Sequence, residues 1–449
     1  MSKDIRLNKG LNIQLTGVAE QVYSNAEFAK NFEVKPTDFH ALTPKIIVKL
    51  GDRVKSGSVL FHDKYNEMIK FCSPVSGEVL DIVRGAKRKI LKIIINVDTK
   101  IIYEDFSNDS ISLSREGIIQ TMCERGVWPF IRQKPYDVIA NPTDMPKSIF
   151  ISAFNSEPIS LDNDFALYGK EELFQYGLNI ITKLTSGLTH LNIDGYSNPS
   201  KVFKEATGVQ INKIFGMHPA GNVGIQIHHI DPINKDDVIW YLNPQDVLTI
   251  ATLFKDGRYD ASKIVAVSGS QIKRPKYYRT IGGTSINNFL KDNLKEGNTR
   301  LISGDVLSGT QIDSEGSLGF YDYQITAIPE GNKPEFLGWI SPGMEKFSAS
   351  RTFFSWLMPA KKYSLDANLH GEERAYVMTG EYEKVLPMDI LPAHLIKAIM
   401  IEDIELMENL GIYEVSTEDF ALCEFVCTSK INVQQLIRHG LDLVRKENS

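Results

Sequence analysis

The sequence is poor in cysteine, in long apolar runs and in excess positive charge. Four cysteines among 449 residues are too few for a disulfide-stabilised fold of this length. No apolar run approaches the roughly 20 residues that cross a bilayer, and the N-terminal MSKDIRLNKG lacks the apolar core of a signal peptide. A net charge of -6 with no dominant basic face argues against nucleic acid as a partner. We therefore expect a cytoplasmic chain without a transmembrane segment, which can still dock on a membrane complex.

Residues 51–89 have the pattern of a compact all-β module. Short runs of valine, isoleucine and leucine alternate there with glycine, proline, serine and aspartate. The layout resembles the biotinyl/lipoyl-like β-sandwich, whose carrier members attach a cofactor to a lysine at the tip of a hairpin. The tip should fall at residues 65–67, and Lys64 comes too early to occupy it. We predict a biotinyl/lipoyl-like sandwich over residues 1–100 that serves packing or docking.

The pattern then changes to alternating helices and strands, which predicts a Rossmann-like α/β domain over residues 101–258. Such alternation implies a largely parallel sheet with helices on its faces. The expected helices cover residues 114–125, 170–184 and 243–254, and the expected strands cover residues 147–154, 190–194 and 211–215.

Short strands and turns return at Lys263, and they predict a β-grasp-like domain over residues 259–330. Residues 331–449 have a mainly helical pattern, clearest at 391–407 and 432–446. The complete expectation is an α/β multidomain protein with four parts.

The segment Ile151–Pro158, ISAFNSEP, is a strand that runs into a polar turn. In a parallel sheet such a turn lies at the carboxyl edge, where ligands bind. The segment resembles the NADESEP and NGAECEP elements of the flavoprotein subunit of respiratory complex I and of the C subunit of the Rnf complex. In those families the neighbourhood binds flavin or nicotinamide nucleotide. Because Glu157 is retained while Asn155 replaces an acid, we interpret Glu157 as part of a relic nucleotide or flavin site.

A second element of those families is missing here. They carry a GxGGAGFPT loop, because only glycine lets backbone N–H groups close around a phosphate. This chain has GVWPFIRQKP at residues 126–135, which predicts that tight flavin binding is lost. Two interpretations of Trp128 and Phe130 remain open. They pack beneath a loop, or, with Arg132 nearby, they form a flat apolar surface against a quinone ring.

The C-terminal cysteines give a similar indication. Rnf subunits carry C-x-x-C-x-x-C-x-x-x-C-P, which supplies thiolates to iron–sulfur clusters. If Cys427 is the fourth ligand and Cys423 the third, the other two positions hold Phe420 and Thr417. Two thiolates cannot complete such a site. We predict that the pair packs in the interior, on one face if the segment is helical.

Three histidines, His218, His228 and His229, lie within the segment GMHPAGNVGIQIHHID. If the segment is a strand, adjacent His228 and His229 point to opposite faces. No acid or cysteine follows at a recognised ligand spacing. We therefore predict no metal site, and we find no pairing of a nucleophile with a base that would mark a catalytic residue.

Several long motifs occur in one order: LFHDKYNEMIKF, SPVSGEVLDIVRGAKR, HPAGNVGIQIHHI, LISGDVLSGT and FALCEFVC. Through them the chain resembles, almost from end to end, the NqrA family, the A subunits of the sodium-translocating NADH:quinone oxidoreductases. The resemblance implies a peripheral subunit on the cytoplasmic face of a six-subunit membrane complex that oxidises NADH, reduces quinone and exports sodium. It implies partners in the other five subunits, especially the membrane-embedded B subunit, an SLBB domain from Lys263, and FMN, FAD and iron–sulfur centres on partner subunits.

The departures from the flavoprotein pattern lead to our expectation for this chain. We expect no tightly bound cofactor and no active site of its own, with quinone as the ligand that Trp128, Phe130 and Arg132 would contact. Two alternatives stay open. One is a soluble oxidoreductase that binds nucleotide or flavin at Glu157, and the other is a pure assembly scaffold.

Overall fold

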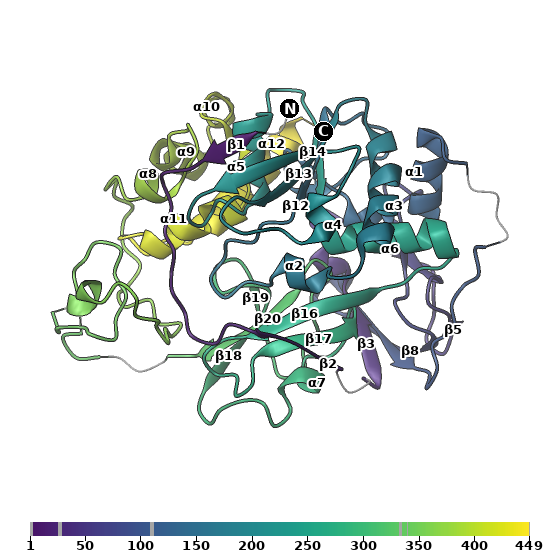
Figure 1. Cartoon of the computed structure of the whole chain (residues 1–449), viewed down its shortest axis with the longest axis horizontal. Helices are drawn as coiled ribbons and strands as arrows, with labels where there is room; N and C mark the ends of the chain where they lie inside the picture. The colour runs from purple at the N-terminus through teal and green to yellow at the C-terminus, as the bar shows by residue number, and fades with distance from the viewer. Residues whose placement is uncertain (1–2, 26–28, 108–111, 332–334, 339, 449) are drawn as a thin grey trace.

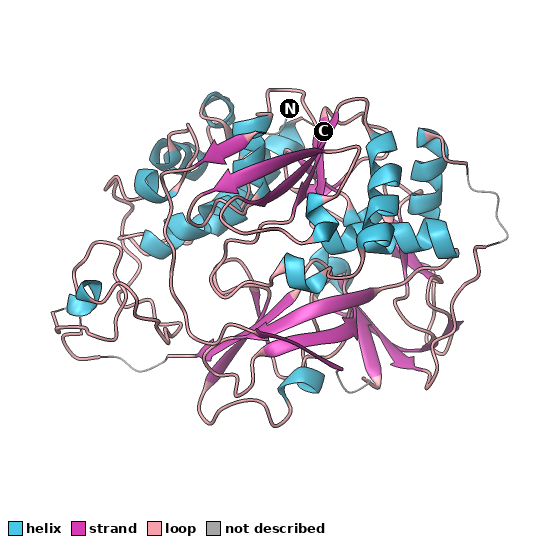
Figure 2. Ribbon diagram, viewed as in Figure 1, coloured by secondary structure: helices cyan, strands magenta, loops and turns pink. Residues whose placement is uncertain are grey.

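The computed structural model describes residues 3–25, 29–107, 112–331, 335–338 and 340–448. Strands gather in the lower half of Figure 2, and most helices surround a separate sheet in the upper half. Among the described residues, no helix has the length and apolar character needed to cross a membrane.

Residues 31–97 form a β-sandwich, which confirms the predicted biotinyl/lipoyl-like module. One sheet has the order β3 (Asn31–Val34), β9 (Ile90–Val97), β8 (Gly77–Arg84) and β5 (Arg53–Val54). The other has the order β4 (Pro44–Ile46), β6 (Val59–Asp63) and β7 (Lys70–Cys72). Alternating apolar side chains such as Ile93 and Ile95 on β9 are fully buried between them. The β6–β7 hairpin exposes Tyr65 at its tip.

The seven-stranded sheet is Rossmann-like over its parallel part. Its order is β1 (Asp4–Arg6), β14 (Gln210–Phe215), β13 (Leu188–Asp194), β12 (Ser148–Ser152), β15 (Ile239–Leu242), β10 (Arg132–Lys134) and β11 (Val138–Ile139). The first five strands run parallel, and β10 and β11 are antiparallel additions. Since β13 lies on one side of β12 and β15 on the other, the strand order reverses at β12, where open α/β sheets bind ligands.

In the described part of the chain, helices pack around this sheet (Figure 1). They are α1 (Arg115–Glu124), α2 (Asn163–Ala166), α3 (Glu171–Ile181), α4 (Lys201–Lys204), α5 (Val223–Ile230) and α6 (Pro244–Asp256). The Ser114 side chain caps α1 by accepting from the Gly117 N–H, as the sequence predicted. Helix α6 starts at a capping box formed by Asn243 and Asp246.

His228 and His229 lie on a helix and not on a strand. Both residues lie on α5, because the apolar positions of VGIQIHHI suit a short helix buried on most sides. His228 Nδ1 lies 2.6 Å from Glu414 Oε2, and His229 Nε2 lies 2.6 Å from the Pro387 carbonyl. The two rings therefore connect α5 to the C-terminal region.

The third sheet has six strands in the order β19 (Thr310–Ile312), β18 (Thr299–Ser303), β20 (Gln324–Pro329), β16 (Ser262–Ser268), β17 (Lys276–Ile281) and β2 (Glu20–Asn25). Helix α7 (Asn287–Leu290) packs on it through Phe289. The N-terminal strands leave the sandwich, since β1 extends the seven-stranded sheet and β2 pairs in parallel with β17. Residues 4–25 thus link two domains (Figure 1).

The C-terminal region is helical from residue 382. Its helices are α8 (Tyr382–Val385), α9 (Pro392–Met400), α10 (Ile404–Asn409), α11 (Ala421–Val426) and α12 (Val433–Glu447). The single helix predicted over 391–407 is wrong, because Glu402 adopts φ 56° and Asp403 caps a new helix.

Short 3-10 helices occur throughout the chain. They are η1 (Pro36–Asp38), η2 (Ala86–Arg88), η3 (Trp128–Phe130), η4 (Thr182–Leu184), η5 (Phe354–Leu357), η6 (Ile412–Glu414) and η7 (Glu418–Phe420).

A buried ion pair joins this helical region to the seven-stranded sheet. Lys134 on β10 and Asp419 in η7 both have fully buried side chains, with Lys134 Nζ 3.3 Å from Asp419 Oδ2. The same oxygen accepts the N–H and the hydroxyl of Ser416, at 3.0 and 2.7 Å. A Cβ at Gly224 would lie 2.2 Å from this oxygen, so the GNVG turn must carry glycine there.

Lys134→Ala should destabilise the fold by about 3–5 kcal/mol, because it leaves the Asp419 carboxylate buried without its cation. Thermal and urea unfolding of the purified chain measure this. The matched control is Lys235→Ala, which breaks an exposed pair with Glu408 and should cost less than about 1 kcal/mol. Equal effects of the two substitutions would show that the buried pair does not hold the C-terminal region in place.

Candidate functional site

A small aromatic cavity lies where the sandwich, the third sheet and the α/β domain meet. Its volume is about 40 Å³, and its wall includes Phe39, Phe130, Tyr259 and Phe320. The Phe320 ring lies 4.7 Å from Phe130, in a stacked arrangement with an interplanar angle of 27°, and 4.7 Å from Phe39. Each domain therefore contributes one ring to the cluster, and junctions between domains are common positions for ligand sites.

Close backbone approach fixes one side of this junction. The Glu33 N–H donates to the Gly283 carbonyl at 2.8 Å, which joins β3 to the turn after β17. Gly283 has φ 78°, and a Cβ there would lie 2.2 Å from the Glu33 carbonyl oxygen. Only glycine allows both the positive φ and this close approach. The IGGTS turn therefore holds the third sheet in direct contact with the sandwich.

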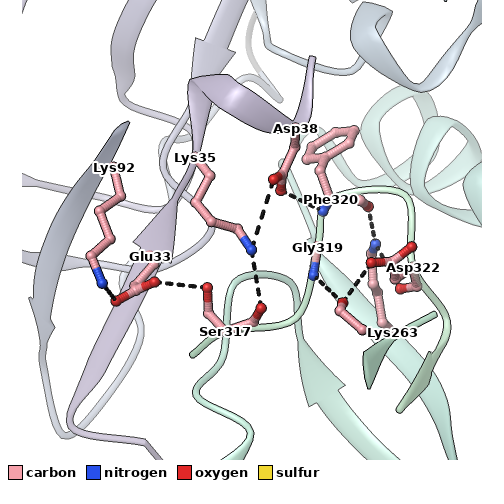
Figure 3. A network of polar contacts seen from close by, with 10 residues as sticks. Glu33, Lys35, Asp38, Lys92, Lys263, Ser317, Gly319, Phe320 and Asp322 are labelled. Carbon is pink, nitrogen blue, oxygen red and sulfur yellow. Dashed lines mark hydrogen bonds and ion pairs between the residues drawn. The ribbon is translucent and has the colours of Figure 1, made fainter. Parts of the chain in front are cut away.

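A polar network surrounds the cavity (Figure 3). Lys35 Nζ donates to the Ser317 carbonyl at 3.0 Å and lies 3.7 Å from Asp38 Oδ1. Asp38 accepts the Phe320 N–H at 2.8 Å, which fixes the segment that carries the Phe320 ring. Burial raises the pKa of Asp38, and Lys35 opposes that rise.

Lys263, on β16, is the buried cation of the cavity. Its side chain donates to the Phe320 carbonyl, and Nζ lies 4.3 Å from the centre of the Tyr323 ring. The residue is only 6% exposed. Burial lowers the pKa of Lys263 to about 8, although the carboxylates of Asp246, Asp322 and Asp38 oppose the shift.

Asp246 is the buried acid that acts on Lys263. It lies in the first turn of α6, is 3% exposed and accepts the Asn243 N–H at 3.1 Å and the Tyr323 hydroxyl. Burial raises the pKa of Asp246 to about 6, with Lys263 the largest opposing influence. An acid and a base whose pKa values both approach neutrality, beside a cavity, are typical of a functional site.

An open groove adjoins the cavity. It has a volume of about 420 Å³ and shares Glu33 and Lys35 with the cavity wall. Its other lining side chains include Lys92, whose Nζ lies 2.6 Å from Glu33 Oε1. Two side chains, Glu33 and Lys35, therefore separate the aromatic interior from solvent.

The structure separates the three residues expected to contact a quinone. Trp128 is fully buried, donates from Nε1 to the Ala140 carbonyl at 2.7 Å and packs edge-on against Trp240. It therefore presents no free ring face. Phe130 does line the cavity. Arg132 lies behind the cavity, with its guanidinium 4.6 Å from the ring centres of both Tyr241 and Tyr321. The quinone contacts themselves remain predictions.

Glu157 lies elsewhere, in the turn after β12, and is not part of the cavity wall. Burial raises the pKa of Glu157 to about 8, and the acidic side chains of Asp305 and Glu418 raise it further. Ile159, two residues later, adopts φ 52°, which is rare for a β-branched residue. The loop that contains Gly221 closes over this turn, with the Gly221 N–H donating to Ser156 Oγ at 2.7 Å.

Sequence reasoning missed Lys263 and Asp246 as site residues. The only signal for Lys263 was a lysine at the start of an otherwise apolar strand, KIVAVS. Asp246 carried no signal for this role, since a single sequence does not show which domain packs over a helix N-terminus. Phe39 and Phe320 carried no signal, because they come together only when two domains meet.

The cysteine prediction is confirmed as far as packing is concerned. Cys423 and Cys427 are both buried free thiols, and the Tyr382 hydroxyl donates to Cys427 Sγ at 3.0 Å. Burial raises the pKa of Cys423 well above its usual range. Within the described ranges, histidine, cysteine, aspartate and glutamate form no group of three or more that could hold a metal ion.

Fold and site together define a multidomain α/β protein whose sandwich, α/β and β-grasp-like domains enclose an aromatic cavity with buried ionisable groups. Family descriptions match each of these parts. Residues 5–98 match the NqrA N-terminal barrel-sandwich hybrid domain, residues 113–259 the NqrA second alpha/beta domain, and residues 264–314 the NQRA C-terminal domain, which is of SLBB type.

Curated relatives match over the whole chain. The A subunit of the Na(+)-translocating NADH-quinone reductase of Alcanivorax borkumensis is 34% identical over 452 aligned residues, covering 99% of this chain and 100% of that one. The protein of the same name from Rhodopirellula baltica is 35% identical over 450 residues, covering 98% of each chain. A solved NAD+-reducing nickel–iron hydrogenase is similar over 48% of this chain and 47% of its own, at 12% identity and a TM-score of 0.36.

The chain belongs to the NqrA family, the A subunits of the Na(+)-translocating NADH-quinone reductases. The resemblance and the fold class expected from the sequence are thereby confirmed.

The raised pKa of Glu157 gives stability a defined pH dependence. A carboxyl whose pKa is higher in the folded state stabilises the fold at low pH, and this contribution is lost as pH rises from its ordinary value near 4.5 to about 8. Glu157→Gln should therefore leave the melting temperature unchanged at pH 4 and raise it at pH 8, because the amide has no charge to bury. Glu172→Gln, at an exposed site on α3, is the control. A variant that is less stable than the parent at pH 8 would contradict the assignment.

Proposed function

We propose that this chain is the peripheral subunit that serves the quinone-reduction end of a sodium-translocating NADH:quinone reductase, and that the aromatic cavity binds the quinone head group. The observation that carries the proposal is the combination of Phe39, Phe130 and Phe320 with the buried Lys263 in one cavity wall. Aromatic faces stack on a flat ring, and an ammonium group donates to a carbonyl oxygen. The relatives' name supplies the substrate class.

A quinone ring fits the cavity only if part of the cavity wall moves. An apolar ring such as benzene occupies a cavity of roughly 150 Å³, whereas this cavity measures about 40 Å³. Phe320 is the half-buried ring of the wall, and a groove of about 420 Å³ lies beyond Glu33 and Lys35. In our proposal the head group displaces Phe320 toward the groove, and the isoprenoid tail leaves by the same route.

We further propose that this chain holds no tightly bound redox cofactor and that the FMN, FAD and iron–sulfur centres belong to partner subunits. Two observations support this. The loop at residues 126–135 lacks the glycines that would close around a flavin phosphate, and its Trp128 is packed in the core. The Cys423–Cys427 pair provides two buried thiols at most.

The alternative of a nucleotide site at Glu157 is less well supported. The charged neighbours that shift the Glu157 pKa are Asp305 and Glu418, both acidic. A phosphate in this place would meet three carboxyl groups without a compensating cation in that set, which electrostatics disfavours. The cavity is therefore the better ligand site.

Docking on a membrane-embedded partner has its own candidate surface. Between β20 and α8, large apolar side chains are exposed in one segment, which stands apart from the sheets at the lower left of Figure 1. These side chains are Phe336, Leu337, Ile340, Met344, Phe354, Trp356 and Leu357, with Phe336 92% exposed. Such clustering marks interaction surfaces. We propose that it contacts a membrane subunit of the complex, with the B subunit as the expected partner, on the cytoplasmic face.

Quinone binding can be measured on the purified chain by quenching of intrinsic fluorescence with a short-chain ubiquinone. Phe320→Leu should weaken binding about tenfold, because it removes one stacking face worth about 1.4 kcal/mol. Phe289→Leu is the matched control, since this ring is buried in the same domain but away from the cavity. Equal affinities of the parent and both variants, or no saturable binding at all, would refute the proposed ligand site.

The docking surface can be tested by purifying the tagged chain from its own membranes in mild detergent. We expect Phe354→Ser with Trp356→Ser to reduce co-purified membrane subunits at least fivefold while the melting temperature of the isolated chain stays unchanged. Tyr168→Ser with Tyr196→Ser removes two rings of the α/β domain that are more exposed than Phe354 and Trp356, and serves as the control. Full recovery of partners with the first variant would place the contact elsewhere.

A further inference from the structure

We propose that Lys263 is the proton donor to the quinone that is reduced in the cavity. This inference rests on the proposed function and deepens it by assigning the acid of the reaction. Lys263 is the only lysine besides Lys35 in the cavity wall, as far as the described residues show. Its side chain emerges from β16 beneath the Phe320 segment (Figure 3).

Position makes Lys263 suited to this step. Its two hydrogen bonds go to main-chain carbonyls, those of Phe320 and, at 3.4 Å, Asp322. An ammonium group has three N–H donors, so one donor is left for a ligand oxygen in the cavity. The Phe320 backbone stays held by Asp38 and Lys263, so movement of the ring alone opens space beside the Lys263 ammonium in our proposal.

The charges around Lys263 are balanced so that it can gain and lose a proton. The charged groups that act on Lys263 are Asp246 on α6, Asp322 before β20, and Lys35 and Asp38 at η1, and the Tyr323 ring lies against its ammonium. Glu33 on β3, Tyr259 after α6 and Cys72 on β7 share the cavity wall with it, and Arg132 acts on Asp246. Three of the carboxylates favour the ammonium form, while burial and Lys35 favour the neutral amine. The result is a pKa of about 8, which suits a general acid near neutral pH.

Reduction of the quinone to the quinol requires two electrons and two protons. Two electrons pass to the ring from a reduced flavin on a partner subunit, which is oxidised, and each quinone carbonyl becomes a C–O⁻ group that requires one proton. The Lys263 ammonium gives its proton to the oxygen within reach and becomes a neutral amine. The second oxygen, toward the groove, takes a proton from water. The amine regains a proton from the groove past Lys35 and Asp38 before the next turnover.

Asp246 acts through Lys263 and is a positioning residue. It holds the Tyr323 hydroxyl, and the Tyr323 ring lies against the Lys263 ammonium. Its negative charge is the largest influence that keeps Lys263 protonated. Loss of that charge should lower the pKa of Lys263 and shift the alkaline decline of the reaction to lower pH.

The test uses the assembled complex and the purified chain together. In the complex, quinone reduction by the parent should decline as pH rises through about 8. Lys263→Arg keeps the charge but cannot release a proton in this range. It should lower kcat at least tenfold at pH 7.5 and abolish the decline near pH 8, while quinone affinity of the isolated chain changes less than threefold.

Asp246→Asn should move the alkaline decline of quinone reduction at least half a pH unit lower. Lys295→Arg, in the same domain and outside the cavity wall, is the control.

The outcomes separate this inference from the proposed function. Saturable quinone binding with unchanged kcat and pH profile in Lys263→Arg overturns the proton-donor role alone. Absence of quinone binding to the parent chain overturns both. If the Lys263→Arg complex fails to assemble, the pH profile of quinone reduction by Asp246→Asn still tests the proton-donor role. An alkaline decline at the same pH as in the parent would contradict that role.

Discussion

The burial of the Lys263 ammonium at the junction of three domains is the constraint on which the rest of this structure depends. A lysine taken out of water destabilises the fold unless carboxylates and carbonyls surround it. Those groups come from separate parts of the chain: Asp38 from the sandwich, Asp246 from α6 and Asp322 from the third sheet. The domains must therefore meet in one arrangement, and the aromatic cavity is the space left beside the charge.

Two further features hold the domains in that arrangement. Strand β2 adds to the third sheet and β1 to the seven-stranded sheet, so residues 4–25 contribute to both. The Lys134–Asp419 pair fixes the helical region to β10, the strand next to the other edge of the seven-stranded sheet. The cavity wall is thus supported from several sides, and Phe320 is its half-buried ring.

The sequence predicted local elements well and long-range contacts poorly. The helix starts expected at Ser114 and Asn243 are confirmed, because helix starts depend on adjacent residues. The helix of His228 was missed because a short apolar run satisfies strand and helix patterns alike. Phe130 was predicted as a site residue and lines the cavity, whereas Trp128 is core. Lys263 and Asp246 could not be found, since their roles arise only where domains pack together.

In our proposal, the cavity beside Lys263 binds the quinone ring. The most direct measurement is a crystal structure of the chain soaked with a brominated short-chain benzoquinone, in which anomalous scattering locates the bromine. We expect one bromine peak between Phe130 and a displaced Phe320, within contact distance of Lys263. A peak at the Glu157 turn instead, or an unaltered Phe320 ring with no peak at the cavity, would contradict the claim.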